Sequence, residues 1–131
     1  MFYFTALTTL ASVLLYGGLG LRVGMARVAY KIEAPAISGH PTFERLYRIQ
    51  MNTLEWLPVH LVGLWMFALY VSDIGAAALG AVWIVGRILY ARAYLADPKS
   101  RTAGFAISFA AMLLLCVGAI GDIVVRLALG D

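Results

Sequence analysis

Residues 43–58 of the chain read Phe43-Glu44-Arg45-Leu46-Tyr47-Arg48-Ile49-Gln50-Met51-Asn52-Thr53-Leu54-Glu55-Trp56-Leu57-Pro58, and an apolar segment continues from there to residue 71. Ionisable groups are costly to bury in a bilayer, so in membrane helices they usually face the bundle interior or a wet cavity. The break at residues 39–41 is followed by Thr42, and proline and threonine both favour a helix start. We therefore expect one helix over residues 42–71 in which a polar stretch leads into an apolar one.

The composition places this helix in a membrane. The 131 residues are 63% hydrophobic and 13% charged, with a mean hydropathy of +0.87 and a formal net charge of +3, whereas a soluble domain is about 45–50% apolar and about 25% charged. Too few polar groups are present to cover a chain this short in water, which argues against an ordinary soluble enzyme and a disordered chain. The single cysteine excludes a disulfide scaffold.

Three further segments are apolar enough to cross a membrane, because a helix needs about 20 residues to span the hydrocarbon. We expect helices over residues 2–30, 74–96 and 101–128, the last two separated by Asp97-Pro98. The fold class is then an all-α membrane protein, a four-transmembrane-helix bundle forming one domain over residues 1–131. The first helix lacks the positive start of a signal peptide and is expected to be retained. Its glycines allow close packing on another helix: Gly17, Gly18, Gly20 and Gly24.

Basic residues are concentrated at one face of the expected bundle. Nine of the ten surround the first and third connections, and Arg126 lies at the other face; the nine are Arg22, Arg27, Lys31, Arg45, Arg48, Arg87, Arg92, Lys99 and Arg101. The positive-inside rule makes the basic face cytoplasmic, so both termini should lie away from the cytoplasm. The shortness of the chain and the lack of a retrieval signal favour a bacterial inner membrane.

Polar side chains of the helix expected at 42–71 fall on two faces. With about 100° per residue and Arg48 as reference, a stripe from about −40° to about +40° contains Glu44, Arg48, Glu55 and Asn52, with Arg45 at its margin. Gln50 lies at about −160°, on the opposite face. One helix thus offers polar groups to two neighbours, which an oligomer with this helix at a subunit contact accommodates.

The helix expected at 74–96 repeats the pattern. Four of its side chains are spaced four, three and four apart and share one face: Trp83, Arg87, Tyr90 and Tyr94. Arginine binds carboxylates bidentately, a glutamate can pair with an ammonium, and amides and phenols add donors and acceptors. Together these groups predict a receptor for a small polyvalent anion with two carboxylates, an amine and a reactive group.

Two other interpretations compete with this one. In the first, Arg48 and Glu55 neutralise each other in the bundle, and arginine, tyrosine and tryptophan side chains anchor the helices at the headgroup level. In the second, the chain is a small proton-coupled exporter. Such exporters typically carry an acid in the first helix, and none lies between Met1 and Leu21.

The polar motif resembles the second-helix signature of the MAPEG family, the membrane-associated proteins in eicosanoid and glutathione metabolism. The matching run is Phe43-Glu44-Arg45-x-Tyr47-Arg48-x-Gln50-x-Asn52-x-x-Glu55-x-x-Pro58, supported by Arg87-x-x-Tyr90-x-x-x-Tyr94 and Arg101. The glutamine-containing form is closer to the branch of the microsomal glutathione transferases and leukotriene-forming synthases than to the prostaglandin E synthase branch. The resemblance covers the whole chain in length and helix number.

The resemblance implies a homotrimer with glutathione, the co-substrate, bound between neighbouring subunits near the cytoplasmic face. It implies no metal. Arg101 would activate the thiol, and the glutathione-binding positions would be Arg27, Arg48, Gln50, Asn52, Glu55, Trp56, Arg87, Tyr90 and Tyr94. Trp56 stands where a tyrosine is common. Val28 stands where leukotriene-forming synthases carry a second arginine, so leukotriene formation is not expected.

The implied function is a glutathione transferase that conjugates the thiolate to lipophilic electrophiles dissolved in the bilayer, in a detoxification role. The same thiolate could also reduce lipid hydroperoxides. The alternative is a non-catalytic lipid-binding or scaffold member of the same family. No nucleic-acid partner is expected.

Other residues that can carry chemistry are interpreted structurally. His60 is expected to be a hydrogen-bonded core or lipid-interface residue, His40 a loop residue, and Cys116 a small buried apolar residue. These three have no known metal-ligand spacing. Asp122 and Arg126 are expected to form an i,i+4 pair.

Overall fold

The computed structural model describes residues 1–131 and is all-helical. Its elements are α1 (Tyr3–Ala29), α2 (Pro41–Tyr70), α3 (Asp73–Ala96), the 3₁₀ turn η1 (Pro98–Arg101) and α4 (Thr102–Leu129). The helix ends lie within one residue of the expected ranges. Three helical segments are long and apolar enough to cross a membrane, namely α1, α3 and the stretch Pro98–Leu129. The helix α2 is not among them, because its charged residues leave an apolar part shorter than about 20 residues.

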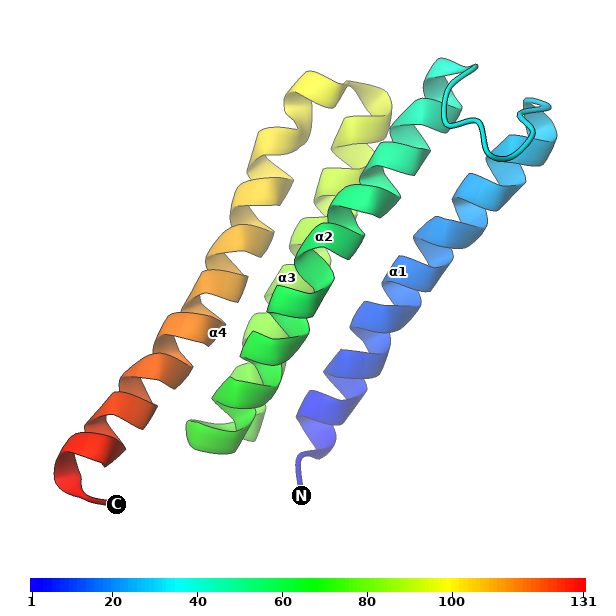
Figure 1. Ribbon diagram of the computed structural model, residues 1–131. Coiled ribbons are helices and arrows are strands. Elements are labelled where there is room, and N and C mark those ends of the chain that lie inside the picture. The colour runs from blue at the N-terminus through cyan, green and yellow to red at the C-terminus, as the bar shows by residue number, and fades with distance from the viewer.

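The helices form a bundle with α2 and α3 at its centre (Figure 1). α1 packs against α2 and α3 on one side, and α4 packs against the same two helices on the other. Both termini lie at one end of the bundle, and the 30–40 connection and η1 lie at the opposite end. The basic residues around the first and third connections are therefore gathered at the end that carries η1.

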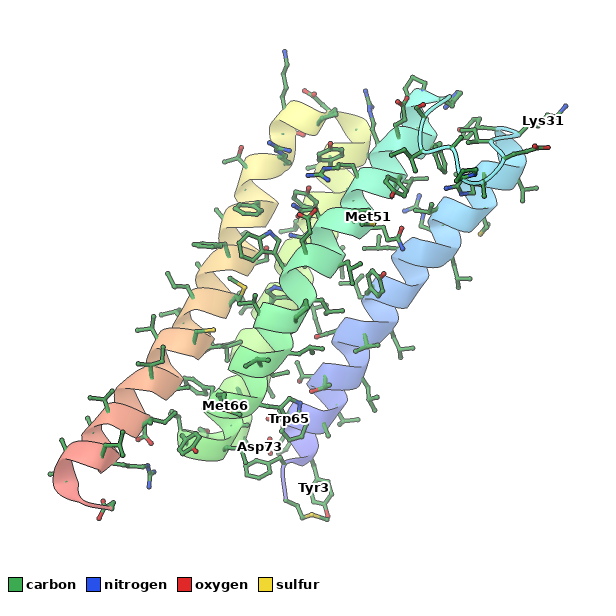
Figure 2. The ribbon with its side chains drawn as sticks, in the orientation of Figure 1. Tyr3, Lys31, Met51, Trp65, Met66 and Asp73 are labelled. Atoms are coloured by element: carbon green, nitrogen blue, oxygen red, sulfur yellow. The ribbon has the colours of Figure 1, made fainter.

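Side chains cap the starts of α1 and α2. His40 Nδ1 accepts a hydrogen bond from the backbone N–H of Thr42 (3.1 Å), which satisfies one free donor at the start of α2. At the start of α1, the N-cap residue Phe2 provides no side-chain hydrogen bond to the free backbone N–H groups. Instead, the Asp73 carboxylate accepts from the backbone N–H groups of Thr5 (2.9 Å) and Phe4 (3.3 Å). Asp73 lies beside the start of α1 in Figure 2, so this contact joins α1 to the first turn of α3.

The closest helix contact lies between α3 and α4 and depends on two glycines. A Cβ on Gly86 would lie 2.6 Å from the backbone nitrogen of Ser108, and one on Gly104 would overlap the backbone of Tyr90. The glycines of α1 do not pack this way within the chain. Gly20 approaches Gln50, and open space lies beside the other three, which are Gly17, Gly18 and Gly24.

Two expected polar contacts are confirmed. His60 is fully buried, its Nε2 lies 3.0 Å from Ser12 Oγ, and its ring stacks on Trp83 at 3.8 Å. It is therefore a hydrogen-bonded core residue. Arg126 Nε donates to Asp122 Oδ2 at 2.5 Å, within one turn of α4.

Candidate functional site

A cavity of about 330 Å³ lies between α2, α3 and the start of α4, at the end of the bundle that carries η1. Six of the ten side chains expected from the sequence line it, together with Phe105; the six are Arg48, Asn52, Glu55, Trp56, Tyr90 and Arg101. Its size falls in the range of ligand pockets, about 300–1,000 Å³. Residues that are far apart in sequence therefore share one concave surface.

An ion pair lies on the α2 wall of the cavity. Arg48 Nη1 and Glu55 Oε1 are 3.6 Å apart, and the side chains keep 54% and 50% of their surface exposed. The competing interpretation, in which Arg48 and Glu55 neutralise each other, is therefore confirmed in part, because the two side chains do form an ion pair. Their half-exposed guanidinium and carboxylate still leave donors and acceptors free for a ligand.

Arg87 lies behind the cavity wall and holds two lining residues in place. It is 1% exposed, and its Nη2 donates to Asn52 Oδ1 (2.8 Å) and Thr53 Oγ1 (2.9 Å). Its guanidinium carbon lies 4.2 Å from the centroid of the Tyr90 ring. Because Asn52 accepts from Arg87 through its oxygen, its amide NH₂ stays available to donate.

The corner between α3 and α4 fixes the position of Arg101. Ser100 Oγ donates to the carbonyl of Ala93 (3.0 Å), which closes η1 onto the last turn of α3. Arg45 Nη1 donates to the carbonyl of Leu95 (2.9 Å), so α2 holds the same turn from the other side. The bond from Arg45 satisfies a carbonyl that the helix end leaves free, whereas the Ala93 carbonyl also accepts from the backbone N–H of Asp97 (2.8 Å).

Arg101 itself is a cation without an acidic partner. No Asp or Glu lies within ion-pair distance of it, and the side chain contacts Tyr94, whose ring centroid is 5.9 Å from the guanidinium carbon. Tyr94 borders Arg101 but does not line the cavity. An unpaired guanidinium at a cavity attracts an anion and stabilises negative charge that develops beside it.

Two expected site residues lie on the α1 side of α2, away from the cavity. Arg27 Nη1 donates to the carbonyl of Ala36 (2.6 Å), and its guanidinium carbon lies 4.8 Å from the centroid of the Phe43 ring. Gln50 faces α1, with Nε2 3.4 Å from the Cβ position of Gly20. Within a single chain, these two residues therefore lie away from the six expected residues that line the cavity.

Two residues at the site were not predicted from the sequence. Phe105 lines the cavity and packs edge-on against Trp56 at 6.0 Å. Its spacing of four from Arg101 places both on one face of a helix, a signal that could have found it. Thr53 supports Arg87, but it lies about 140° from Arg48 around α2, so the polar stripe gave no sign of it.

The charges at the cavity favour an anion that also carries an ammonium. Arg48 and Arg101 supply two positive charges, Glu55 supplies one negative charge, and Arg87 adds a buried positive charge behind the wall. Carboxylates suit the guanidinium groups, and an ammonium suits Glu55. The aromatic rings of Trp56 and Phe105 form an apolar side to the same cavity.

The fold and the cavity define a helical membrane protein with a cavity lined by two arginines. The chain belongs to the MAPEG family, whose model matches residues 5–121. It is 45% identical to an uncharacterised protein of Synechocystis sp., over 93% of this chain and 89% of that protein. It is 42% identical to human microsomal glutathione S-transferase 2, over 77% and 69% of the two chains. It is 35% identical to bovine leukotriene C4 synthase, over 88% and 78%.

Proposed function

We propose that the protein is a membrane-bound glutathione transferase that joins the glutathione thiolate to lipophilic electrophiles. The observation that carries the proposal is the unpaired Arg101 at a cavity that also contains the Arg48–Glu55 pair. Relatives named as a glutathione S-transferase and a leukotriene C4 synthase support it. Glutathione has two carboxylates, one ammonium and one thiol, which is the set of groups that the cavity is suited to receive.

The assembly we propose is a homotrimer in which each glutathione site forms between two subunits. Arg27 and Gln50 lie on the side of α2 opposite the cavity. In a closed ring, that side of one subunit can face the cavity of its neighbour. All four helices would cross the bilayer, and the basic end of the bundle would face the cytoplasm. We propose a bacterial inner membrane as the location, with both termini on the opposite face.

The mechanism we propose depends on the charge of the thiol. A free thiol has a pKa near 8.5, so only a few per cent is thiolate at pH 7. Arg101 stays protonated in a protein and can only stabilise the thiolate, which lowers the thiol pKa and releases the proton to water. The sulfur then forms a bond to the electrophilic carbon. The leaving group, where there is one, departs with the electron pair of the broken bond.

Turnover by the purified protein tests this proposal directly. We expect the detergent-solubilised protein to bind glutathione and to conjugate it to an aryl halide such as 1-chloro-2,4-dinitrobenzene, with release of chloride. Glutathione binding without conjugation of any electrophile would contradict the proposal and favour the non-catalytic lipid-binding alternative. Absence of glutathione binding would contradict the proposal as well.

Replacing Glu55 with glutamine should weaken glutathione binding more than folding. The change removes the charge expected to pair with the ammonium, and we expect KM for glutathione to rise about tenfold, as for a lost charge-assisted hydrogen bond. Thermal stability should change little, because the side chain is half exposed. Glu44→Gln, on the same helix but outside the cavity, is the matched control. A Glu55→Gln protein that does not assemble would favour the purely structural role.

Mixing two inactive chains tests whether the site forms between subunits. We expect Arg27→Ala and Arg101→Ala to lose most activity when each is expressed alone. In mixed trimers, a site is intact when one neighbour supplies Arg27 and the other supplies Arg101, so random assembly should restore about a quarter of the wild-type activity. The control is a mixture of the two variants that were expressed and purified separately, so that each trimer contains only one kind of chain. If co-expression restores nothing, each site lies within one chain.

A further inference from the structure

A second groove lies between α1 and α3, on the side of the bundle away from α2 and α4. Its volume is about 290 Å³. The apolar walls come from Leu15 and Leu19 of α1 and from Ile88 and Ala91 of α3. Gly18 also lines the groove, and nothing lies within 4 Å of the position where its Cβ would be. Absence of a side chain at Gly18 therefore leaves an open apolar channel along α1.

Two arginines stand at this groove, and neither is used by the site already described. Arg22 of α1 and Arg92 of α3 are exposed and line the groove. Neither forms an ion pair with an acid of the chain. Two unpaired guanidinium groups above an apolar channel are complementary to a molecule with an anionic head and an apolar tail.

The two arginines lie near the ends of helices that are long and apolar enough to cross a membrane. Arg22 lies seven residues before the end of α1 and Arg92 four before the end of α3, which is about 10 Å and about 6 Å along the helices. Both helices end at the basic end of the bundle. Arginine side chains at this depth extend toward the headgroups while their stems stay among apolar groups.

The groove stays open when Arg27 and Gln50 face a neighbouring subunit. Around α1, with the buried Leu19 as reference, Arg22 lies at about −60° and Arg27 at about +80°. Gly20, which approaches Gln50, lies on the same side as Arg27, at about +100°. The groove and the proposed subunit contact therefore lie about 140° apart around α1, which leaves the groove free to face the lipid.

We propose that this groove binds an anionic phospholipid, with the phosphate on Arg22 and Arg92 and part of one acyl chain along Gly18. A lipid fits because the apolar walls lie within two membrane-length helices. The anionic class fits because the two guanidinium groups are not neutralised by the protein. Basic pockets between transmembrane helices recognise such headgroups.

Lipid titration of the detergent-purified protein, followed by native mass spectrometry, tests the proposal. Dioleoyl phosphatidylglycerol and dioleoyl phosphatidylcholine have the same acyl chains, so their difference isolates the headgroup. We expect phosphatidylglycerol to bind about 30-fold more tightly, the factor expected for two arginine charges near a surface. Arg22→Gln/Arg92→Gln should remove this preference, and Arg22→Lys/Arg92→Lys should keep only part of it, because lysine lacks the bidentate fork.

The control variant is Lys31→Gln/Lys99→Gln, which removes the same charge from the same end of the bundle but outside the groove. Lys31 points away from the bundle in Figure 2. The control should keep the wild-type preference, and conjugating activity should be unchanged in all three double variants. Equal binding of the two lipids by the wild type would overturn the proposal. An equal loss of the phosphatidylglycerol preference in the control variant would also overturn it. Displacement of the bound lipid by millimolar inorganic phosphate would do the same.

Discussion

Arg101→Ala is expected to lower the turnover of glutathione conjugation about 30-fold at pH 7, because a thiol whose pKa returns to about 8.5 is only about 3% thiolate at that pH. Glutathione binding should remain near the wild-type level, because Arg48, Glu55 and Asn52 still line the cavity. Stability should be preserved as well, since Arg101 is exposed and has no ion-pair partner to leave unpaired. Steady-state kinetics with an aryl halide, alongside direct binding of glutathione, separates these effects.

The pH dependence of the conjugation rate shows whether the loss in Arg101→Ala comes from a raised thiol pKa. Arg101 favours the thiolate and so lowers the pKa of the bound thiol. In the variant that pKa should rise toward its free value near 8.5. The rate of the variant should therefore fall as pH drops below about 8.5, whereas the wild type keeps its rate to a lower pH. The deficit should be largest near neutral pH and should shrink above about pH 9.

The matched control for this variant is Lys99→Ala, which removes a cation from the same 3₁₀ turn but outside the cavity. It should leave both turnover and the pH profile unchanged. Unchanged turnover in Arg101→Ala, with the wild-type pH profile, would show that another group activates the thiol.

The second large effect is expected for Gly104→Ala. The added methyl group would overlap the backbone of Tyr90, and backbone atoms cannot move aside without separating α3 from α4. Overpacking costs about 1–3 kcal/mol where side chains can adjust, so we expect a loss of about 3 kcal/mol or more here. Since Tyr90 and Arg101 both line the cavity, any protein that still folds should also bind glutathione less tightly.

Gly121→Ala provides the comparison on the same helix. Nothing lies within 4 Å of its Cβ position, so the substitution should leave stability unchanged or raise it by up to about 1 kcal/mol through helix propensity. Thermal unfolding in detergent and the yield of folded protein report on both variants. Equal stability of the two variants would show that α3 and α4 are less closely packed at Gly104 than in the structure.

The helices were predictable from the sequence because their signals are local. Runs of apolar residues, the break at residues 39–41 and Asp97-Pro98 set the helix ends to within one residue. The polar stripe of α2 was predictable for the same reason, since helical periodicity alone places Arg48, Asn52 and Glu55 on one face. Their convergence with Tyr90 was expected from the polar faces of the two helices, and that of Arg101 from the family resemblance. The tertiary structure brings all five to one cavity.

Local patterns do not show which helix a given face meets. The sequence predicts close packing at the α1 glycines, but the tight contact lies at Gly86 and Gly104, because a glycine matters only where another backbone approaches it. The spacing along α3 places Arg87 on the same face as Tyr90 and is equally consistent with a ligand-binding role. In the structure, Arg87 is instead buried against Asn52 and Thr53. Periodicity fixes the direction of a side chain around its own helix. The distance to a neighbouring helix depends on how four helices pack, and that packing places Arg101 at the cavity and Arg27 on the other side of α2.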